Sequence, residues 1–143
     1  MPHFTIEYTA NIKREADVPG LLAKVNDVLI GEEDAGRKVF PIGAIRSRAI
    51  EIADWRIADG GADDAFVHAR LAIGAGRSEA VKKHACDALF ETIKAHFAEL
   101  YARRGLALSL ELVEFSEAGT YKHNNIHARF GKVGMTGKRE ERS

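Results

Sequence analysis

The stretch PHFTIEY, residues 2–8, decides how this 143-residue chain begins to fold. Its apolar side chains Phe4, Ile6 and Tyr8 alternate with polar ones, which is the period of a β-strand with one buried face. A proline can be the first residue of a strand with little loss of ladder hydrogen bonding. The sequence therefore predicts a strand that starts at the beginning of the chain and holds Pro2 in a fixed place.

Pro2 is the first candidate functional residue, because removal of Met1 would leave it with a secondary amine that no other residue offers. A free α-amino group has a pKa near ~8, and burial among cations lowers that pKa toward neutrality. Such an amine can accept a proton and return it. We expect the mature chain to begin at Pro2, since a small residue after Met permits removal of the Met. If Met1 stays, the Pro2 nitrogen is an amide without basic character.

A helix and a second strand are predicted next. Asp17 is in position to cap the helix, with Pro19 in its first turn. Apolar residues then repeat at helical spacing, at Val18, Leu21, Leu22, Val25, Val28 and Leu29. Residues 31–38 are polar and predict a loop, and residues 42–52 predict the strand.

The second half of the chain repeats this order of elements. Residues 65–73 predict a strand, and the turn GAGRS at 74–78 ends in a Ser N-cap. A long amphipathic helix runs to about Arg104, with Gly105 as its C′ residue. Residues 106–115 predict the last strand, because Leu alternates along it.

This order predicts an α+β fold with two β-α-β units in one domain, residues 1–130, and a sheet with helices on one face. The two strands of each β-α-β crossover should be parallel. Residues 116–130 lack periodicity and are the expected contact to a neighbouring copy, because a small sheet has edges that must be covered. Residues 131–143 are small, polar and charged, and predict a flexible C-terminal tail.

Composition narrows the class of protein. The chain has 21 basic and 21 acidic residues, so its net charge of zero argues against nucleic acid or an acidic membrane as the main partner. Cys86 is the one cysteine, which excludes an intramolecular disulfide and indicates a reducing compartment. We expect Cys86 to be a small apolar residue of a helix. No signal peptide or membrane-spanning run is visible. We expect a soluble cytoplasmic protein.

Three arginines are candidates for anion binding. Arg46 and Arg48 are two residues apart, so on a strand they share a face, and an arginine fork binds carboxylates bidentately. The alternative is that they pair with Glu51 or Asp54 at the sheet edge. Arg77 lies between the end of a strand and the start of a helix, where ligands of open α/β sheets bind beyond the carboxyl ends of strands. The alternative there is a plain turn.

No metal or cofactor site is predicted. His123 and His127 are four residues apart, but no third ligand or HExxH glutamate accompanies them and the segment does not read as a helix. Asn124 and Asn125 between them fit turns or polar contacts. The chain also has no phosphate-binding loop, dinucleotide fingerprint or GxSxG motif.

Taken together, MPHF at 1–4, ADVPGL at 16–21, IRSR at 45–48, IGAGRS at 73–78 and NNIHA at 124–128 resemble the 5-carboxymethyl-2-hydroxymuconate isomerase family of the tautomerase superfamily. The segment AFVH, residues 65–68, adds to the same resemblance, which covers roughly residues 2–130. Two departures are the 31–38 loop, which looks longer than in the family, and the additional 131–143 tail.

The resemblance implies a homotrimer of β-α-β repeats with sites near subunit boundaries and no cofactor. It implies that Pro2 is the general base and that Arg46 and Arg77 hold substrate carboxylates; Arg48 matches the motif with a less defined role. The implied reaction converts 5-carboxymethyl-2-hydroxymuconate to its 2-oxo-3-ene isomer, in the catabolism of homoprotocatechuate and 4-hydroxyphenylacetate. Two alternatives stay open: a tautomerase of another 2-hydroxydienoate or an arylpyruvate, and a non-enzymatic ferredoxin-like domain that binds small anions.

Overall fold

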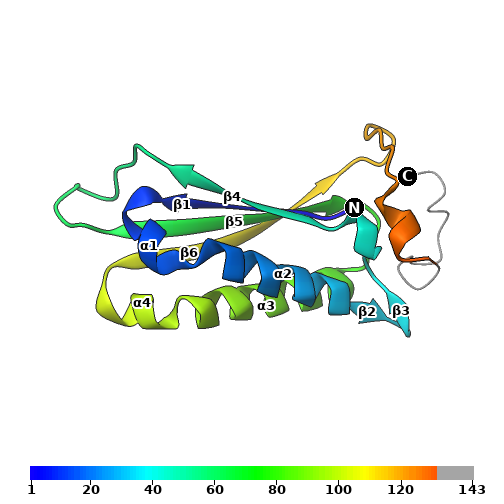
Figure 1. The fold of residues 1–143 in the computed structure, drawn as a ribbon, viewed down its shortest axis with the longest axis horizontal. Helices are drawn as coiled ribbons and strands as arrows, with labels where there is room; N and C mark the ends of the chain where they lie inside the picture. Colours follow the sequence, from blue (N-terminus) through cyan, green and yellow to red (C-terminus); the bar gives the residue numbers. More distant parts are fainter. Residues whose placement is uncertain (132–143) are drawn as a thin grey trace.

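The computed structural model describes residues 1–131, in which four long strands lie side by side in the order β4-β1-β5-β6 (Figure 1). Their bounds are β1 (His3–Thr9), β4 (Arg46–Ile52), β5 (Ala65–Gly74) and β6 (Leu106–Phe115). The pairs β1–β4 and β5–β6 are parallel, and β1 pairs with β5 in the antiparallel direction. The two predicted parallel pairs are therefore confirmed.

This strand order excludes the ferredoxin-like alternative. In that fold each β-α-β unit is split by a strand of the other unit. Here the two strands of each unit are direct neighbours in the sheet. The α+β architecture with two intact β-α-β units is the one observed.

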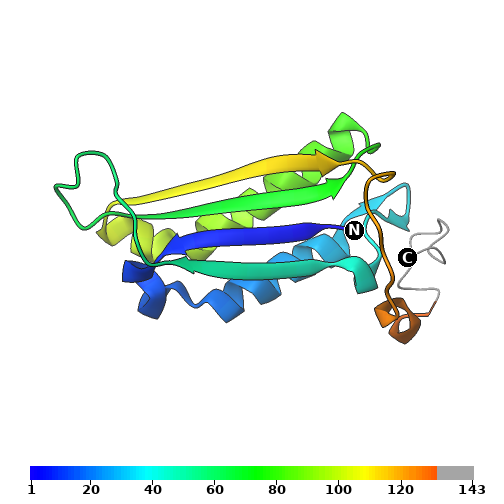
Figure 2. The same ribbon diagram turned by 90° about the horizontal axis from the view of Figure 1, so that it is seen from above.

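Within residues 1–131, the main helices lie on one face of the sheet, as predicted, and no helix covers the other face (Figures 1 and 2). The two main helices are α2 (Val18–Gly31) and α3 (Glu79–His96), which lie next to each other along the strands. The short helices η1 (Ala10–Ile12), α1 (Lys13–Ala16) and α4 (Ala98–Arg103) lie at one end of the sheet. No helix among the described residues is long and apolar enough to cross a membrane.

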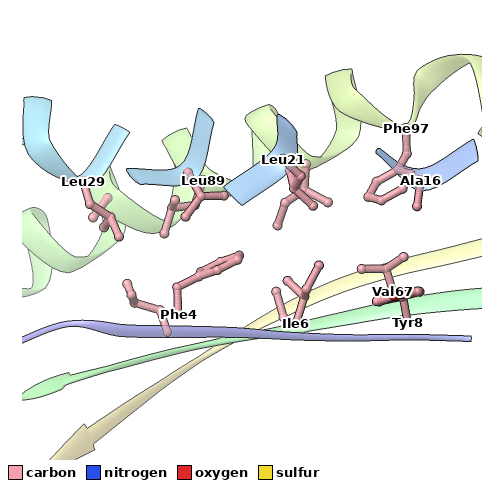
Figure 3. Packing of buried hydrophobic residues seen from close by; sticks show 14 of the residues in the cluster. Phe4, Ile6, Tyr8, Ala16, Leu21, Leu29, Val67, Leu89 and Phe97 are labelled. Carbon is pink, nitrogen blue, oxygen red and sulfur yellow. The ribbon is translucent and has the colours of Figure 1, made fainter. Parts of the chain in front are cut away.

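The core fills the space between the sheet and the helices (Figure 3). Phe4, Ile6 and Tyr8 of β1 all point into it and are buried, so the alternation in PHFTIEY is confirmed. The buried residues that complete the layer come from β5, α2 and α3, and include Val67, Ala69, Leu71, Leu21, Val25, Leu29, Ala85, Leu89 and Ile93. Because β1 is central and buried, the residue that precedes it is held at the end of the sheet.

Two predicted elements differ in the structure. The 31–38 loop contains a hairpin of β2 (Glu33–Asp34) and β3 (Arg37–Lys38), closed by Ala35 and Gly36 at φ 54° and 78°. Two positive φ angles in succession fit a tight hairpin turn, which polarity alone does not reveal. The following strand starts at Arg46 rather than residue 42, because η2 (Ile42–Ala44) precedes it.

The long second helix is also interrupted. Phe97, at φ −99° and ψ 11°, separates α3 from α4 and packs into the core against the periodic face. Gly105 does not have the left-handed conformation expected of a C′ glycine. A Cβ atom at Gly105 would instead collide with the Asp64 carboxylate, so the glycine permits a close approach of two chain segments.

The predicted cap of α2 is confirmed, and it allows a stability prediction. The Asp17 carboxylate accepts the Gly20 N–H at 3.3 Å, and Asp17 itself is left-handed at φ 44°. Asp17→Ala removes the cap and places a side chain that cannot bond locally in that conformation, so we expect unfolding to become easier by about 1–3 kcal/mol. Urea denaturation measures this. Asp27→Ala, on the exposed side of the same helix, is the control, and equal midpoints for both variants would contradict the prediction.

Candidate active site

Four segments of the chain meet at one end of the sheet (Figure 2). Because the two parallel pairs run in opposite directions, the amino ends of β1 and β4 lie beside the carboxyl ends of β5 and β6. Pro2, Arg46 and Arg77 come from three of these ends, and residues 116–130 cross over the same end after β6. Sequence reasoning placed ligands at carboxyl ends of strands alone, whereas this site combines both kinds of end.

The amino terminus lies in this cluster. Pro2 is buried, and its carbonyl accepts the Arg46 N–H at 3.1 Å. With Met1 in place, burial lowers the pKa of the Met1 amine to about 5, with further lowering by Arg77 and then Lys122. Glu117 opposes the shift and Arg46 adds a smaller lowering. An amine at this position is therefore neutral, and so able to accept a proton, at pH 7.

Arg46 and Arg48 share one face of β4, as predicted. They pair in register with His3 and Thr5, whose side chains lie on the helix-free face of the sheet. The Arg46 guanidinium donates to the Ala44 carbonyl at 2.8 Å, whereas the Arg48 guanidinium lies 3.2 Å from His3 Nδ1. Burial lowers the pKa of His3, followed by the charges of Arg48 and Arg46. Arg46 thus belongs to the cluster around the amino terminus. Arg48 lies two residues farther along β4.

The alternative in which Arg46 and Arg48 pair with Glu51 or Asp54 does not match the contacts of these arginines. Glu51 forms an ion pair with Lys13 at 3.0 Å, at the opposite end of the sheet. The contacts of Arg46 and Arg48 described above are to Ala44 and His3 instead. The two guanidinium groups therefore keep capacity for an anion.

Arg77 is anchored by the segment that follows the unexpected hairpin. Its guanidinium donates to the carbonyls of Gly74 at 3.1 Å and Val39 at 3.3 Å, and lies 4.9 Å from the centre of the Phe40 ring. Burial lowers the pKa of Arg77, while Glu117 and Glu114 raise it; a guanidinium remains charged in either case. The segment after the hairpin thus helps to place one of the predicted site residues, a connection that no sequence pattern predicted.

Sequence reasoning missed Glu117 and Lys122. The Lys122 ammonium lies 3.3 Å from a carboxylate oxygen of Glu117, and the Lys122 side chain is only 21% exposed. Both residues belong to the non-periodic segment after β6, so no pattern marked them. The signal would have been topological, because the end of β6 and the start of β1 lie at the same end of the sheet, on either side of β5.

The crossing segment is fixed to its own chain by asparagine. The Asn124 amide donates to the Gly43 carbonyl at 3.0 Å and lies 3.3 Å from Nε2 of the buried His127. Its side-chain oxygen accepts the Ile126 N–H at 2.7 Å, at the start of η3 (Ile126–Arg129). The predicted turn role of asparagine is confirmed at Asn124. Tyr121 of the same segment is 94% exposed, so its ring is accessible to a neighbouring copy.

The structure also bears on two minor candidates, a reactive thiol at Cys86 and a metal site. Cys86 packs against the core from α3, and burial, with a smaller contribution from Asp87, raises its thiol pKa. It is therefore protonated at neutral pH, as expected of a packing residue. Within residues 1–131, no group of three or more His, Cys, Asp or Glu side chains is arranged to hold a metal ion. The predicted 131–143 tail lies outside the described residues except for Gly131.

The charges around the amino terminus predict how its pKa responds to a substitution. Glu117 raises the pKa of the terminal amine, so Glu117→Gln should lower it further and extend the neutral form to more acidic pH. The rate at which an acylating reagent labels the terminal amine, followed against pH, measures this. Glu91→Gln removes an exposed ion pair with Lys94 on α3 and is the control. An unchanged labelling midpoint in Glu117→Gln would contradict the prediction.

Comparison with known proteins places this arrangement in a family. A model of the 5-carboxymethyl-2-hydroxymuconate isomerase family matches residues 2–130. The 5-carboxymethyl-2-hydroxymuconate Delta-isomerase of Escherichia coli is 48% identical over 130 residues, which is 91% of this chain and 99% of that protein.

Solved structures agree with this match. The crystal structure of a 5-carboxymethyl-2-hydroxymuconate isomerase from Deinococcus radiodurans R1 is 54% identical, with a TM-score of 0.85 over 92% of this chain and 95% of that one. A second crystal structure, of a 5-carboxymethyl-2-hydroxymuconate delta-isomerase, is 32% identical, with a TM-score of 0.86 and coverage of 92% and 94%. The chain belongs to the 5-carboxymethyl-2-hydroxymuconate isomerase family.

Proposed function

We propose that this protein is a 5-carboxymethyl-2-hydroxymuconate Δ-isomerase that works in the catabolism of homoprotocatechuate and 4-hydroxyphenylacetate. The relatives above supply the substrate by name. The observation that carries the proposal is the place of the amino terminus, where burial and then the charges of Arg77 and Lys122 lower the pKa of the Met1 amine. An enzyme that moves a proton along an anionic substrate needs a neutral base beside fixed positive charge.

The reaction is a proton transfer through the Pro2 nitrogen once Met1 has been removed. The neutral amine takes the proton of the 2-hydroxyl group. The electron pair of that O–H bond then forms the second bond of the 2-oxo C=O group. The diene electrons shift toward C5, and the protonated amine returns its proton to C5. The product is the 2-oxo-3-ene isomer, with no change in oxidation state, so these steps need neither a metal nor an organic cofactor.

Arg46 and Arg77 act as the carboxylate-binding residues in this proposal. They lie on either side of Pro2, on β4 and on the turn after β5. Their charges hold the two ends of the conjugated chain and stabilise the negative charge that develops on the dienolate. The Arg48 guanidinium lies beside the His3 ring. We therefore assign Arg48 the role of orienting that side chain at the edge of the site.

A homotrimer is the assembly that we propose, following the sequence resemblance. Strands β4 and β6 are both sheet edges, and the helix-free face includes Ile50 at 49% exposure. Such edges and apolar residues favour cover by another copy. A mass of three chains in sedimentation equilibrium is the corresponding measurement, and a monomer would contradict it.

The decisive experiment replaces Pro2 by Ala in a chain from which Met1 has been removed. The remaining primary amine has no ring to fix its direction, so turnover of 5-carboxymethyl-2-hydroxymuconate should fall at least about 10²-fold. Pro19→Ala, in the first turn of α2 at the far end of the sheet, is the matched control. Full activity of Pro2→Ala would refute the proposed base.

A substrate panel tests the reaction itself. The wild-type protein should turn over 5-carboxymethyl-2-hydroxymuconate with a higher kcat/KM than 2-hydroxymuconate or an arylpyruvate, because those compounds carry fewer carboxylates for the cationic cluster. A preference for either smaller substrate would favour the tautomerase alternative.

A further inference from the structure

We propose that Lys122 is a third cationic substrate-binding residue and that it holds the carboxymethyl carboxylate, an inference that rests on the proposed function. The substrate has three carboxylates, whereas Arg46 and Arg77 account for two. Lys122 comes from the segment that crosses the end of the sheet where the amino terminus lies (Figure 2).

The geometry holds the Lys122 ammonium in place. Glu117 lies 3.3 Å from Lys122 Nζ and is packed so closely on Gly74 that a Cβ atom there would collide with its carboxylate. The Gly74 carbonyl also accepts a hydrogen bond from Arg77 at 3.1 Å. Glu117 and Arg77 therefore both contact Gly74 at the end of β5, and Lys122 joins them through its ion pair with Glu117. An ammonium has three donors, so one ion pair leaves two for a substrate oxygen.

The electrostatics agree with that placement. Lys122 lowers the pKa of the Met1 amine, one residue before the Pro2 nitrogen, more than Arg46 does. The interaction of two charges weakens with distance, so the Lys122 charge acts close to the amine. Among the cations of residues 1–131 that lower this pKa, Arg77 has a larger effect and Arg46 a smaller one.

The chemistry of the substrate decides which carboxylate Lys122 meets. The proton returns from the amine to C5, and the carboxymethyl branch is attached to C5. Its carboxylate is two bonds from the carbon that the amine protonates, and among the three carboxylates only the one at C6, bonded to C5 itself, is closer. The other two carboxylates end the conjugated chain, where Arg46 and Arg77 flank it. That leaves Lys122, on the segment that crosses the same end of the sheet, as the cation that we assign to the side branch.

The test compares two substrates in Lys122→Met, which keeps the length of the side chain and removes its charge. On 5-carboxymethyl-2-hydroxymuconate, we expect kcat/KM to fall about ten- to a hundredfold, mainly through KM. On 2-hydroxymuconate, which lacks the branch, the fall should be less than about threefold. Values are taken from the pH-independent plateau, because loss of a cation also raises the pKa of the amine. Lys122→Arg should restore most of the loss.

The control is Lys13→Met, which removes the Lys13–Glu51 ion pair at the opposite end of the sheet and should leave both rates unchanged. An equal loss on both substrates in Lys122→Met would show a purely structural role and overturn the inference. So would no loss on either. A wild-type protein that is inactive on the tricarboxylate refutes the proposed function instead, and the inference falls with it.

Discussion

A chain that keeps Met1 is expected to lose isomerase activity by about 10²- to 10⁴-fold, the range that general acid–base catalysis contributes. The Pro2 nitrogen is then an amide and cannot accept a proton. The Met1 amine does lie at the same end of the sheet, with its pKa lowered to about 5, but it is one residue away from the Pro2 nitrogen. One residue spans about 3.8 Å, far more than the ~1 Å misplacement that can reduce a rate a hundredfold.

The measurement follows intact mass and activity together. A preparation that retains Met1 is treated with methionine aminopeptidase, and activity should rise in proportion to the fraction of chains that lose Met1. The control is the same treatment of a chain that already begins at Pro2, which should not change. Full activity at a stage when all chains still carry Met1 would rule out the Pro2 nitrogen as the base.

Arg77→Ala is expected to lower kcat/KM by about 10²- to 10³-fold, because it removes a charged, two-pronged contact to a carboxylate. It should also move the acid limb of the pH–rate profile to higher pH. Arg77 is the nearby charge that most lowers the pKa of the terminal amine, so its removal raises that pKa. At a given pH a smaller fraction of the amine is then neutral.

Steady-state kinetics against pH tests both parts of this prediction. Arg77→Lys keeps the charge and loses the fork, so it should preserve the acid limb while KM stays raised. Arg56→Ala removes a guanidinium that binds the Asp59 carbonyl in the loop at the opposite end of the sheet, and it should resemble wild type. Since Arg77 also binds the Gly74 and Val39 carbonyls, thermal unfolding must show that Arg77→Ala is folded. A folded variant with wild-type KM would contradict the assignment.

The main elements could be predicted because each has a local signature. Alternation over residues 2–8 marked β1 and its buried face, and Asp17 and Ser78 marked the starts of α2 and α3. The order of these elements fixed two parallel pairs, since a β-α-β crossover returns the chain in the same direction. The arginines were found because they lie at the ends of such elements.

The rest depended on contacts between distant segments, which leave no period in the sequence. Phe97 ends α3 although the apolar spacing continues past it. Val39 and Phe40 hold Arg77 from the short stretch between the predicted loop, 31–38, and the predicted strand, 42–52, to which no element was assigned. Lys122 and Glu117 meet the amino terminus because β6 ends where β1 begins, which follows from the antiparallel β1–β5 pairing rather than from nearby residues.

The first residues of the chain lie at the end of the sheet where the four site segments meet. This position limits where the protein can be tagged or fused without loss of activity. An affinity tag or a fusion partner joined to the amino end would occupy the place of the reacting amine, even if the rest of the fold were intact. The loop between β4 and β5, at residues 53–64, lies at the opposite end of the molecule (Figure 2). That loop is the place for an inserted label or an attachment point to a surface.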